Sequence, residues 1–378
     1  MIVRHFLQWV RTAAAGERAD ATSALARALL YSDLSADDRI AAEGALVMLL
    51  DDPSPLVRRA MAEALAASPD APPSVIMALA ADQPQIASLV LERSPLLLDT
   101  DLVDSVGSGD TVTQSAIARR PDLPRSVAAA IAEVGTADAC LALMDNDSAE
   151  IAPFSLDRMV ERHGHVAPIR EALLARDDLP VSTRQAILVR LAETLAEFVT
   201  ARVWLEEGRA RRITREATEK ATVALAASSA TNEVHPLVAH LRESGQLSSG
   251  LILRALLSGH VRLFEEALAQ LSGLPLSRVA AVVHDRRGAA FQALYSKAGL
   301  PASAYSAFRA ALDAMHETGF DGEFGGAARL KRRMVERVLT NCLREDSEEI
   351  GPLLTLLRRF ATEATRDEAR LFCEELAA

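Results

Sequence analysis

Aromatic residues are scarce in this chain of 378 residues: they make up 4% of the sequence, although 49% of it is hydrophobic. Aromatic and β-branched side chains are the usual builders of β-strands, so a shortage of aromatics argues against an extensive sheet. Alanine and leucine dominate instead. Because alanine lets helix axes approach and leucine fills the space between them, the composition predicts an all-α fold of short, close-packed helices.

Cysteine is also rare. The residues Cys140, Cys342 and Cys373 lie far apart and form no C-x-x-C pair, which argues against a disulfide framework or a cysteine-bound cluster. We expect buried thiols in a reduced, cytoplasmic protein. Residues 1–20 are too short and too charged for a signal peptide or a membrane span, so no membrane-spanning segment is expected.

Motifs that carry chemistry are missing as well. The sequence contains neither a phosphate-binding P-loop nor a G-x-S-x-G nucleophile motif. His163 and His165 stand two residues apart, a spacing that does not share a helix face, and no nearby acidic pair completes a metal site. His284 is better explained as the end of a helix. We therefore expect no enzymatic activity, no cofactor and no metal.

Positive charge is in deficit, and the formal net charge is −11. An acidic chain repels phosphate backbones, so nucleic acid is not expected as a partner. Cations still gather locally at the end of the glycine-rich residues 319–333, in Lys331, Arg332 and Arg333. The segment lacks a Gly-Lys pair, so we expect a loop that leads into a helix. The alternative is a phosphate-binding loop that uses the three cations.

A short motif, Leu-Pro-x-Ser, recurs four times, at residues 123–126, 179–182, 274–277 and 300–303. Proline ends the preceding structure, leucine folds back over the turn as an apolar plug, and the next helix begins. Either serine caps that helix or proline takes its first position while serine bonds a free amide. The motif therefore predicts a joint between helices.

Prolines also mark a repeat, since Pro69, Pro95 and Pro121 follow one another at intervals of 26 residues. Acidic turns lie between the proline turns, so each unit has two short helices. A single unit cannot bury both of its apolar faces, whereas stacked units can. We therefore predict an α-solenoid over residues 1–200, a long helix and linker over 201–245, and a C-terminal helical domain over 246–378.

Some positions within these segments carry more specific expectations. Residues 185–230 contain no proline and one glycine, which predicts one or two long helices. Gly273 and Gly299 precede Leu-Pro and suit the left-handed position after a helix.

Several stretches, among them "LLDDPSPLVRRAMAEALAASPDAP", "IARRPDLP" and "RALLSGHVRLFEEALAQLSGLP", resemble an uncharacterised family of alphaproteobacterial proteins with HEAT-like or leucine-rich-repeat-variant-like helical repeats. The resemblance covers about residues 36–318. It implies a right-handed helical solenoid in a bacterial, cytoplasmic protein, and it brings no catalytic residues. "DDPSPLVRRAMAEAL" also resembles the HEAT repeat itself, in which an Asp, a Pro and an Arg hold the turn. Here Asp51 or Asp52, Pro53 and Arg58 take those places.

Arginines recur at or near the turns, namely Arg58, Arg59, Arg93, Arg119, Arg120, Arg162 and Arg176. Equivalent positions of stacked repeats line up along one ridge. Such a ridge can bind an acidic segment of a protein partner, because guanidinium groups pair bidentately with carboxylates. The competing interpretation is that each arginine bonds the acidic turn residues of its own repeat.

These observations favour a non-enzymatic protein-interaction scaffold or adaptor that uses a helical-repeat surface. The alternative is a regulatory sensor whose C-terminal helical domain binds a small ligand or a phosphorylated partner. Self-association is a further expectation, through an uncapped end of the stack or the alanine-rich residues 221–229.

Overall fold

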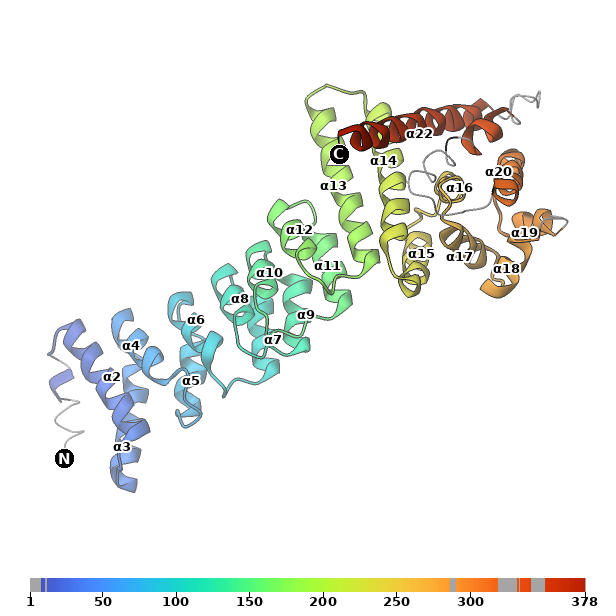
Figure 1. Ribbon diagram of the computed structural model, residues 1–378. Coiled ribbons are helices and arrows are strands. Elements are labelled where there is room, and N and C mark those ends of the chain that lie inside the picture. The colour runs from blue at the N-terminus through green and yellow to red at the C-terminus, as the bar shows by residue number, and fades with distance from the viewer. Residues whose placement is uncertain are drawn as a thin grey trace. The chain divides into compact units, whose positions relative to one another are not determined.

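The computed structural model describes residues 8–10, 12–285, 290–318, 332, 334–340 and 351–377 (Figure 1). Every regular element within these ranges is a helix, which confirms the predicted all-α class. None of these helices is long and apolar enough to cross a bilayer. Contacts divide the chain into two units, residues 1–179 and 180–378. The sequence-based limits at residues 200 and 245 stay a prediction, because contact density does not measure which segments fold alone.

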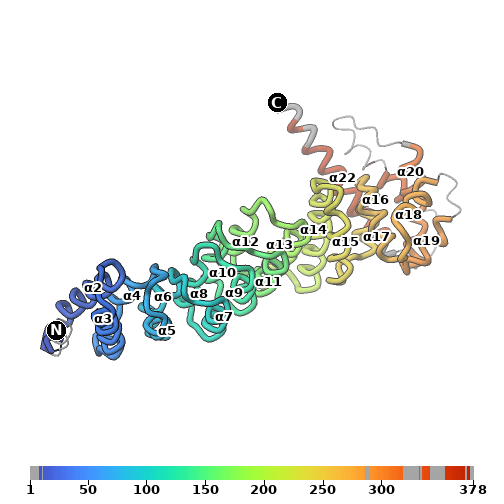
Figure 2. Tube along the Cα trace, turned by 90° about the horizontal axis from the view of Figure 1, so that it is seen from below, coloured from blue at the N-terminus to red at the C-terminus, as the bar shows by residue number. Residues whose placement is uncertain are grey.

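The first unit consists of short helices packed against neighbours two places along the chain. In chain order they are α2 (Ala15–Tyr31), α3 (Ala36–Leu49), α4 (Pro55–Leu65), α5 (Pro73–Ala80), α6 (Pro84–Arg93), α7 (Asp99–Ser108), α8 (Thr111–Ala118), α9 (Arg125–Val134), α10 (Ala137–Met144), α11 (Pro153–His163) and α12 (Ala167–Leu174). The even-numbered helices contact one another in sequence along one side, and α7, α9 and α11 do so along the other (Figure 2). Each pair thus buries the apolar face that its neighbour exposes.

Local start signals explain many of these boundaries. Ser35 precedes α3, and its Oγ accepts a hydrogen bond of 3.2 Å from the backbone N–H of Asp38. Pro55 lies in the first turn of α4, where its missing N–H has no intrahelical partner to lose. Asp110 caps α8 in the same way as Ser35 caps α3, with an acceptor distance of 2.9 Å to the N–H of Thr113.

The Leu-Pro-x-Ser joint differs in detail from both alternatives drawn from the sequence. Pro124, Pro180 and Pro275 occupy the N-cap position itself, one residue before the helix. A proline fits there because the N-cap is extended and its φ matches the proline ring. Leu123 is fully buried, which confirms its role as a plug. Ser126 then uses its hydroxyl to bond the carboxylate of Asp99 at 2.9 Å.

The second unit begins with two long helices. Its elements are α13 (Val181–Ala201), α14 (Glu207–Ser228), η1 (Thr231–Glu233), α15 (Val234–Glu243), α16 (Ser249–Leu257), α17 (Val261–Ser272), α18 (Leu276–Val283), α19 (Phe291–Lys297), η2 (Ala302–Ala304), α20 (Tyr305–Thr318) and α22 (Gly351–Ala377). The long pair α13 and α14 confirms the prediction for residues 185–230. Phe264 and Phe308 are fully buried in this unit and stack with their ring centroids 6.1 Å apart.

Glycines end helices of this unit in the left-handed conformation. Gly273 and Gly299 have φ of 66° and 68°, as predicted. The thiol prediction holds for Cys140, which is buried, and burial raises its pKa to about 11. It is wrong for Cys373, which is exposed because it lies on the solvent side of α22. Cys342 lies outside the described residues.

Candidate functional site

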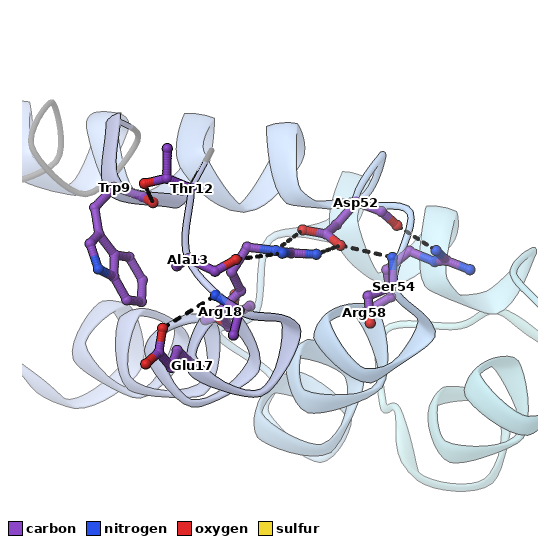
Figure 3. A network of polar contacts seen from close by, with 10 residues as sticks. Trp9, Thr12, Ala13, Glu17, Arg18, Asp52, Ser54 and Arg58 are labelled. Carbon is purple, nitrogen blue, oxygen red and sulfur yellow. Dashed lines mark hydrogen bonds and ion pairs between the residues drawn. The ribbon is translucent and has the colours of Figure 1, made fainter.

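Arg58 belongs to the interior of the helix stack rather than to an open ridge. Its Nε and Nη2 donate to the carboxylate of Asp82 at 2.6 and 3.0 Å, and its Nη1 donates to the backbone carbonyl of Asp52 at 2.6 Å. Arg18 grips the carboxylate of Asp52 in the same forked manner, at 2.8 and 2.9 Å (Figure 3). Asp52 also accepts from the N–H of Ser54 at 2.8 Å. Of the two neighbouring aspartates, Asp52 is buried and makes these contacts, whereas Asp51 is exposed.

Electrostatics keep these aspartates ionised. Hydrogen bonds from Arg18 lower the pKa of Asp52, against the opposing effect of burial. Burial alone would raise the pKa of Asp82, but the hydrogen bonds from Arg58 and from the N–H of Gln83 outweigh it and lower that pKa. Each ion pair joins an arginine of one helix to the acidic turn that precedes a later helix. These ion pairs therefore fix how successive helix pairs are aligned.

Arg120 and Arg162 also act within the stack, by bonding free carbonyls at helix ends. Arg120 donates to the carbonyls of Leu91 and Ser94 at 2.5 and 2.7 Å, and burial lowers its pKa. Arg162 donates to the carbonyl of Ala132 at 2.9 Å. These carbonyls lie near the C-terminal ends of α6 and α9, where the helix leaves acceptors without an intrahelical donor. These three arginines bond within the stack, but not as the competing interpretation proposed. Arg58 bonds the carboxylate of Asp82, 24 residues away, and Arg120 and Arg162 bond backbone carbonyls instead of acidic side chains.

Among the other arginines of the predicted ridge, Arg59, Arg93 and Arg119 are exposed, whereas Arg176 is half-buried. Arg59 pairs with Glu63 one turn along α4, at 2.8 Å. Arg93 and Arg119 share a single carboxylate, Glu92, at 3.8 and 3.6 Å. Exposed pairs of this kind contribute little to stability, so their guanidinium groups can exchange one carboxylate for another. These three arginines remain candidates for contact with a partner, whereas Arg176 is held by Asp178 at 2.8 Å.

Of the three cations predicted to cluster near residue 332, Arg332 alone lies among the described residues. Lys331 and Arg333 lie outside the described residues, as does most of the glycine-rich segment. Arg332 donates to Glu336 at 2.7 Å and to Glu368 of α22 at 2.9 Å, and these bonds raise its pKa. Its guanidinium therefore holds α22 in place.

The histidines singled out from the sequence have structural contacts. The Nε2 of His163 lies 3.1 Å from the carbonyl of Gly135. His284 ends α18, as predicted, and its Nε2 lies 3.0 Å from the carboxylate of Glu265. Among the described residues, no group of three or more His, Cys, Asp or Glu side chains is arranged to hold a metal ion.

The connection between α13 and α14 is strained. The N–H of Trp204 donates to the carbonyl of Val199 at 3.0 Å, and the N–H of Val203 donates to that of Thr200 at 2.9 Å. This pair of bonds is the Schellman motif that ends many helices, and the motif requires a left-handed residue, usually glycine. Val203 takes that position, with φ of 57°. A β-branched residue is unfavourable there because its Cβ approaches the following carbonyl.

Large apolar side chains gather around this strained turn. We call the group the hairpin tip, and its members are Leu195, Phe198, Val203, Trp204 and Ile213, together with Arg202. Val203 is 87% exposed and Trp204 63% exposed. The rings of Phe198 and Trp204 meet edge to face with centroids 5.8 Å apart, and the guanidinium of Arg202 lies 4.3 Å from the centroid of Phe198. The aromatic pair is thus held in one arrangement while it faces solvent.

Helix length explains why the hairpin tip is exposed. α13 and α14 have 21 and 22 residues, whereas α15 and α16 have 10 and 9. At 1.5 Å per residue, the long pair is about twice as long as the helices beside it. The turns near residue 203 therefore extend beyond those neighbours (Figure 1). This surface is not among the sites predicted from the sequence. The available signal was an apolar "VW" after a long helix, at a position where glycine is usual.

The base of the same hairpin borders a cleft of about 690 Å³ within the second unit. The hydroxyl of Ser248 donates to the carboxylate of Glu219 at 2.7 Å, and burial raises the pKa of Glu219. Beside this pair, the Nε2 of the buried Gln185 donates to the Oε1 of Gln246 at 2.7 Å. The Oε1 of Gln185 lies 3.1 Å from the Nε2 of His240. The cleft therefore presents a fixed polar network next to apolar side chains of α13, namely Val189, Ala192 and Ala196.

A comparison with protein families gives a match over most of the described helices. A sequence model of the family described as "Uncharacterised protein conserved in bacteria (DUF2336)" matches residues 86–347. No curated protein and no solved structure matches the chain.

Proposed function

Because this chain belongs to the DUF2336 family of bacterial proteins, we propose that it is a non-enzymatic protein–protein interaction scaffold. In this proposal the helices form an α-solenoid of HEAT-like repeats in an alphaproteobacterial, cytoplasmic protein that does not bind nucleic acid. The stacked pairs supply rigid elements, and exposed side chains on them supply the contacts.

The observation that carries the proposal is the hairpin tip. An exposed tryptophan beside an exposed β-branched residue in a strained turn is unfavourable for the isolated chain in two ways, through exposed apolar surface and through backbone conformation. Both disadvantages are offset when a partner covers the surface and holds the turn. Tryptophan and arginine are also the residue types that most often dominate the energy of protein interfaces.

A capture experiment tests this function. The purified chain and its variant Trp204→Ala are immobilised and exposed to an extract of the bacterium that makes the protein. Phe154→Ala is the matched control, because Phe154 is 61% exposed on α11 of the first unit. We expect proteins retained by the wild type and the control but lost with Trp204→Ala. The same retained proteins on all three would contradict the proposal.

A second candidate function, a sensor for a small polar ligand, is favoured by the cleft that Glu219 and Gln246 line. A cleft of several hundred Å³ with a few fixed polar groups is typical of small-molecule sites. A ligand that prefers the folded state raises the unfolding temperature. A thermal-shift screen of nucleotides and amino acids tests it: a shift that disappears with Glu219→Gln supports the sensor, and no shift with any compound counts against it.

A further inference from the structure

A second surface of the chain complements the hairpin tip. A cleft of about 510 Å³ lies at the C-terminal ends of α10 and α12 in the first unit. Met144 and Ala175 give it an apolar lining, and Asp145, Asp147 and Asp177 stand exposed around it. We call it the acidic cleft. The apolar lining of the cleft complements the apolar side chains of the hairpin tip. Independently, its carboxylate rim complements the arginines near the tip.

Charge favours the match. The lining of the acidic cleft contains four aspartates and one arginine, Arg176, which is already bonded to Asp178. Residues 198–213 around the hairpin tip contain four arginines and two glutamates. Arg209 and Arg212 among them are exposed. Opposite charges around an apolar centre promote correct docking and disfavour other partners.

The composition of the hairpin tip favours a protein surface over a lipid surface. Residues 198–213 contain arginine but no lysine, and protein interfaces are enriched in arginine and aromatic residues and depleted in lysine. The chain as a whole carries a net charge of −11, which opposes approach to an anionic membrane.

We propose that the hairpin tip of one copy of this chain docks in the acidic cleft of a second copy. Trp204 and Val203 fill the apolar centre, and Arg209 and Arg212 face the aspartates of the rim. The inference rests on the proposed function and names its partner. Such a contact joins two different surfaces, so a pair of copies keeps one free acidic cleft, on the first copy, and one free hairpin tip, on the second. Contacts of this kind propagate into rings or open chains.

Sedimentation of the full-length protein tests the proposal through three variants, two that disrupt the hairpin tip and one that disrupts the acidic cleft. Trp204→Ala removes the tip, with Arg209→Glu/Arg212→Glu as a second tip variant. Asp145→Lys/Asp177→Lys removes the cleft. All of these side chains are exposed, so the fold is expected to tolerate the changes. We expect the wild type and Phe154→Ala to exceed the dimer mass as concentration rises. Each disrupted variant should associate at least about 30-fold more weakly, the loss expected for an interface hot spot.

Mixing the variants gives the decisive result. A tip variant retains an intact cleft and the cleft variant retains an intact tip, so their equimolar mixture is expected to form a dimer that cannot grow further. A mixture that stays monomeric while the wild type associates would overturn the tip-to-cleft contact.

Two other outcomes would also overturn it. One is a wild type that stays monomeric at every concentration while Trp204→Ala still abolishes capture from the extract; the proposed function then survives with a different partner. The other is a monomeric wild type that cosediments with phosphatidylglycerol vesicles in a Trp204-dependent way. A monomeric wild type with unchanged capture by Trp204→Ala would remove both proposals.

Discussion

Replacing Val203 by glycine should stabilise the second unit, although it removes a hydrophobic side chain. Val203 lies in the left-handed region with φ of 57° and is 87% exposed. Its side chain therefore contributes little burial, and the dominant effect is backbone strain. Relief of that strain gains about 1–2 kcal/mol. The greater freedom of glycine in the unfolded chain costs about 0.5–1 kcal/mol. The expected net gain lies between about 0 and 1.5 kcal/mol, with a central value of about 0.75 kcal/mol.

The chain offers the reverse substitution as a control. Gly245 ends α15 with the same two bonds, from the N–H of Gln246 to the carbonyl of Leu241 at 2.7 Å and from its own N–H to that of Arg242 at 3.1 Å. Its φ is 69°, and an added Cβ would meet no atom within 4 Å. Gly245→Val therefore introduces the strain that Val203→Gly removes, at a site where the added Cβ meets open space.

The assay is thermal unfolding followed by the fluorescence of Trp204, in a Trp9→Phe background that leaves no other tryptophan. For a unit that spans residues 180–378, 1 kcal/mol corresponds to about 2–4 °C. Val203→Gly should raise the midpoint by about 1–4 °C, and Gly245→Val should lower it by a similar amount. A midpoint that falls with Val203→Gly would refute the strain argument. If the hairpin tip is the docking surface, the more stable variant should also capture its partner less well.

Three further predictions concern the first unit and the thiols. The pKa of Asp52 is lowered in the folded state, so its contribution to stability is present above the unfolded pKa of about 3.9 and is lost as the pH falls through the folded value. Urea unfolding from pH 7 to pH 2 should therefore show a smaller acid-induced loss of stability in Asp52→Asn than in the wild type. An unchanged loss would contradict the role of the pair with Arg18. Leu123 is fully buried and Leu56 is exposed. Leu123→Ala should therefore lower the free energy of unfolding by about 3 kcal/mol, and Leu56→Ala should lower it by about 0.5 kcal/mol or less. Equal losses of stability would argue against the plug. A maleimide reagent near neutral pH should label Cys373 quickly and spare the buried Cys140. Mass spectrometry of the digested protein locates the label. Rapid labelling of both cysteines would show that the helix around Cys140 opens.

The local signals in the sequence were sufficient to predict the helical class, and they were sufficient at Gly273 and Leu123, because left-handed glycines and apolar plugs act over a few residues. They were insufficient for the Leu-Pro-x-Ser joint. The helix begins directly after proline, one residue later than a first-position proline implies and two residues earlier than a capping serine implies. The N-cap and the first helical position differ mainly in ψ, which proline does not fix.

The arginines illustrate a second limit. Arg58 and Arg120 were assigned correctly to the turns, but the side chain alone does not reveal whether it faces solvent or a carbonyl of another helix pair. That depends on the helix end that packs against it, 29 residues away for Arg120 and Leu91. Arg59, next to Arg58 in sequence, points to solvent because a helix turns by about 100° per residue.

The hairpin tip could not be identified from apolar patterning, because Leu195, Phe198 and Ile213 resemble the buried stripe of an ordinary helix. Their exposure follows from the length of α13 and α14 relative to the helices beside them, which is a property of the assembled unit. The strain at Val203 is likewise visible only once the Schellman bonds fix its φ.

Photo-crosslinking in living cells tests most directly whether the hairpin tip contacts another protein. A photoreactive amino acid replaces Val203, and in a parallel strain it replaces Phe154 on α11. Illumination is expected to give a covalent protein adduct of defined mass from position 203, twice the mass of the chain when the partner is a second copy, and none from position 154. The absence of an adduct from position 203, or the same adducts from both positions, would contradict a docking role for the tip.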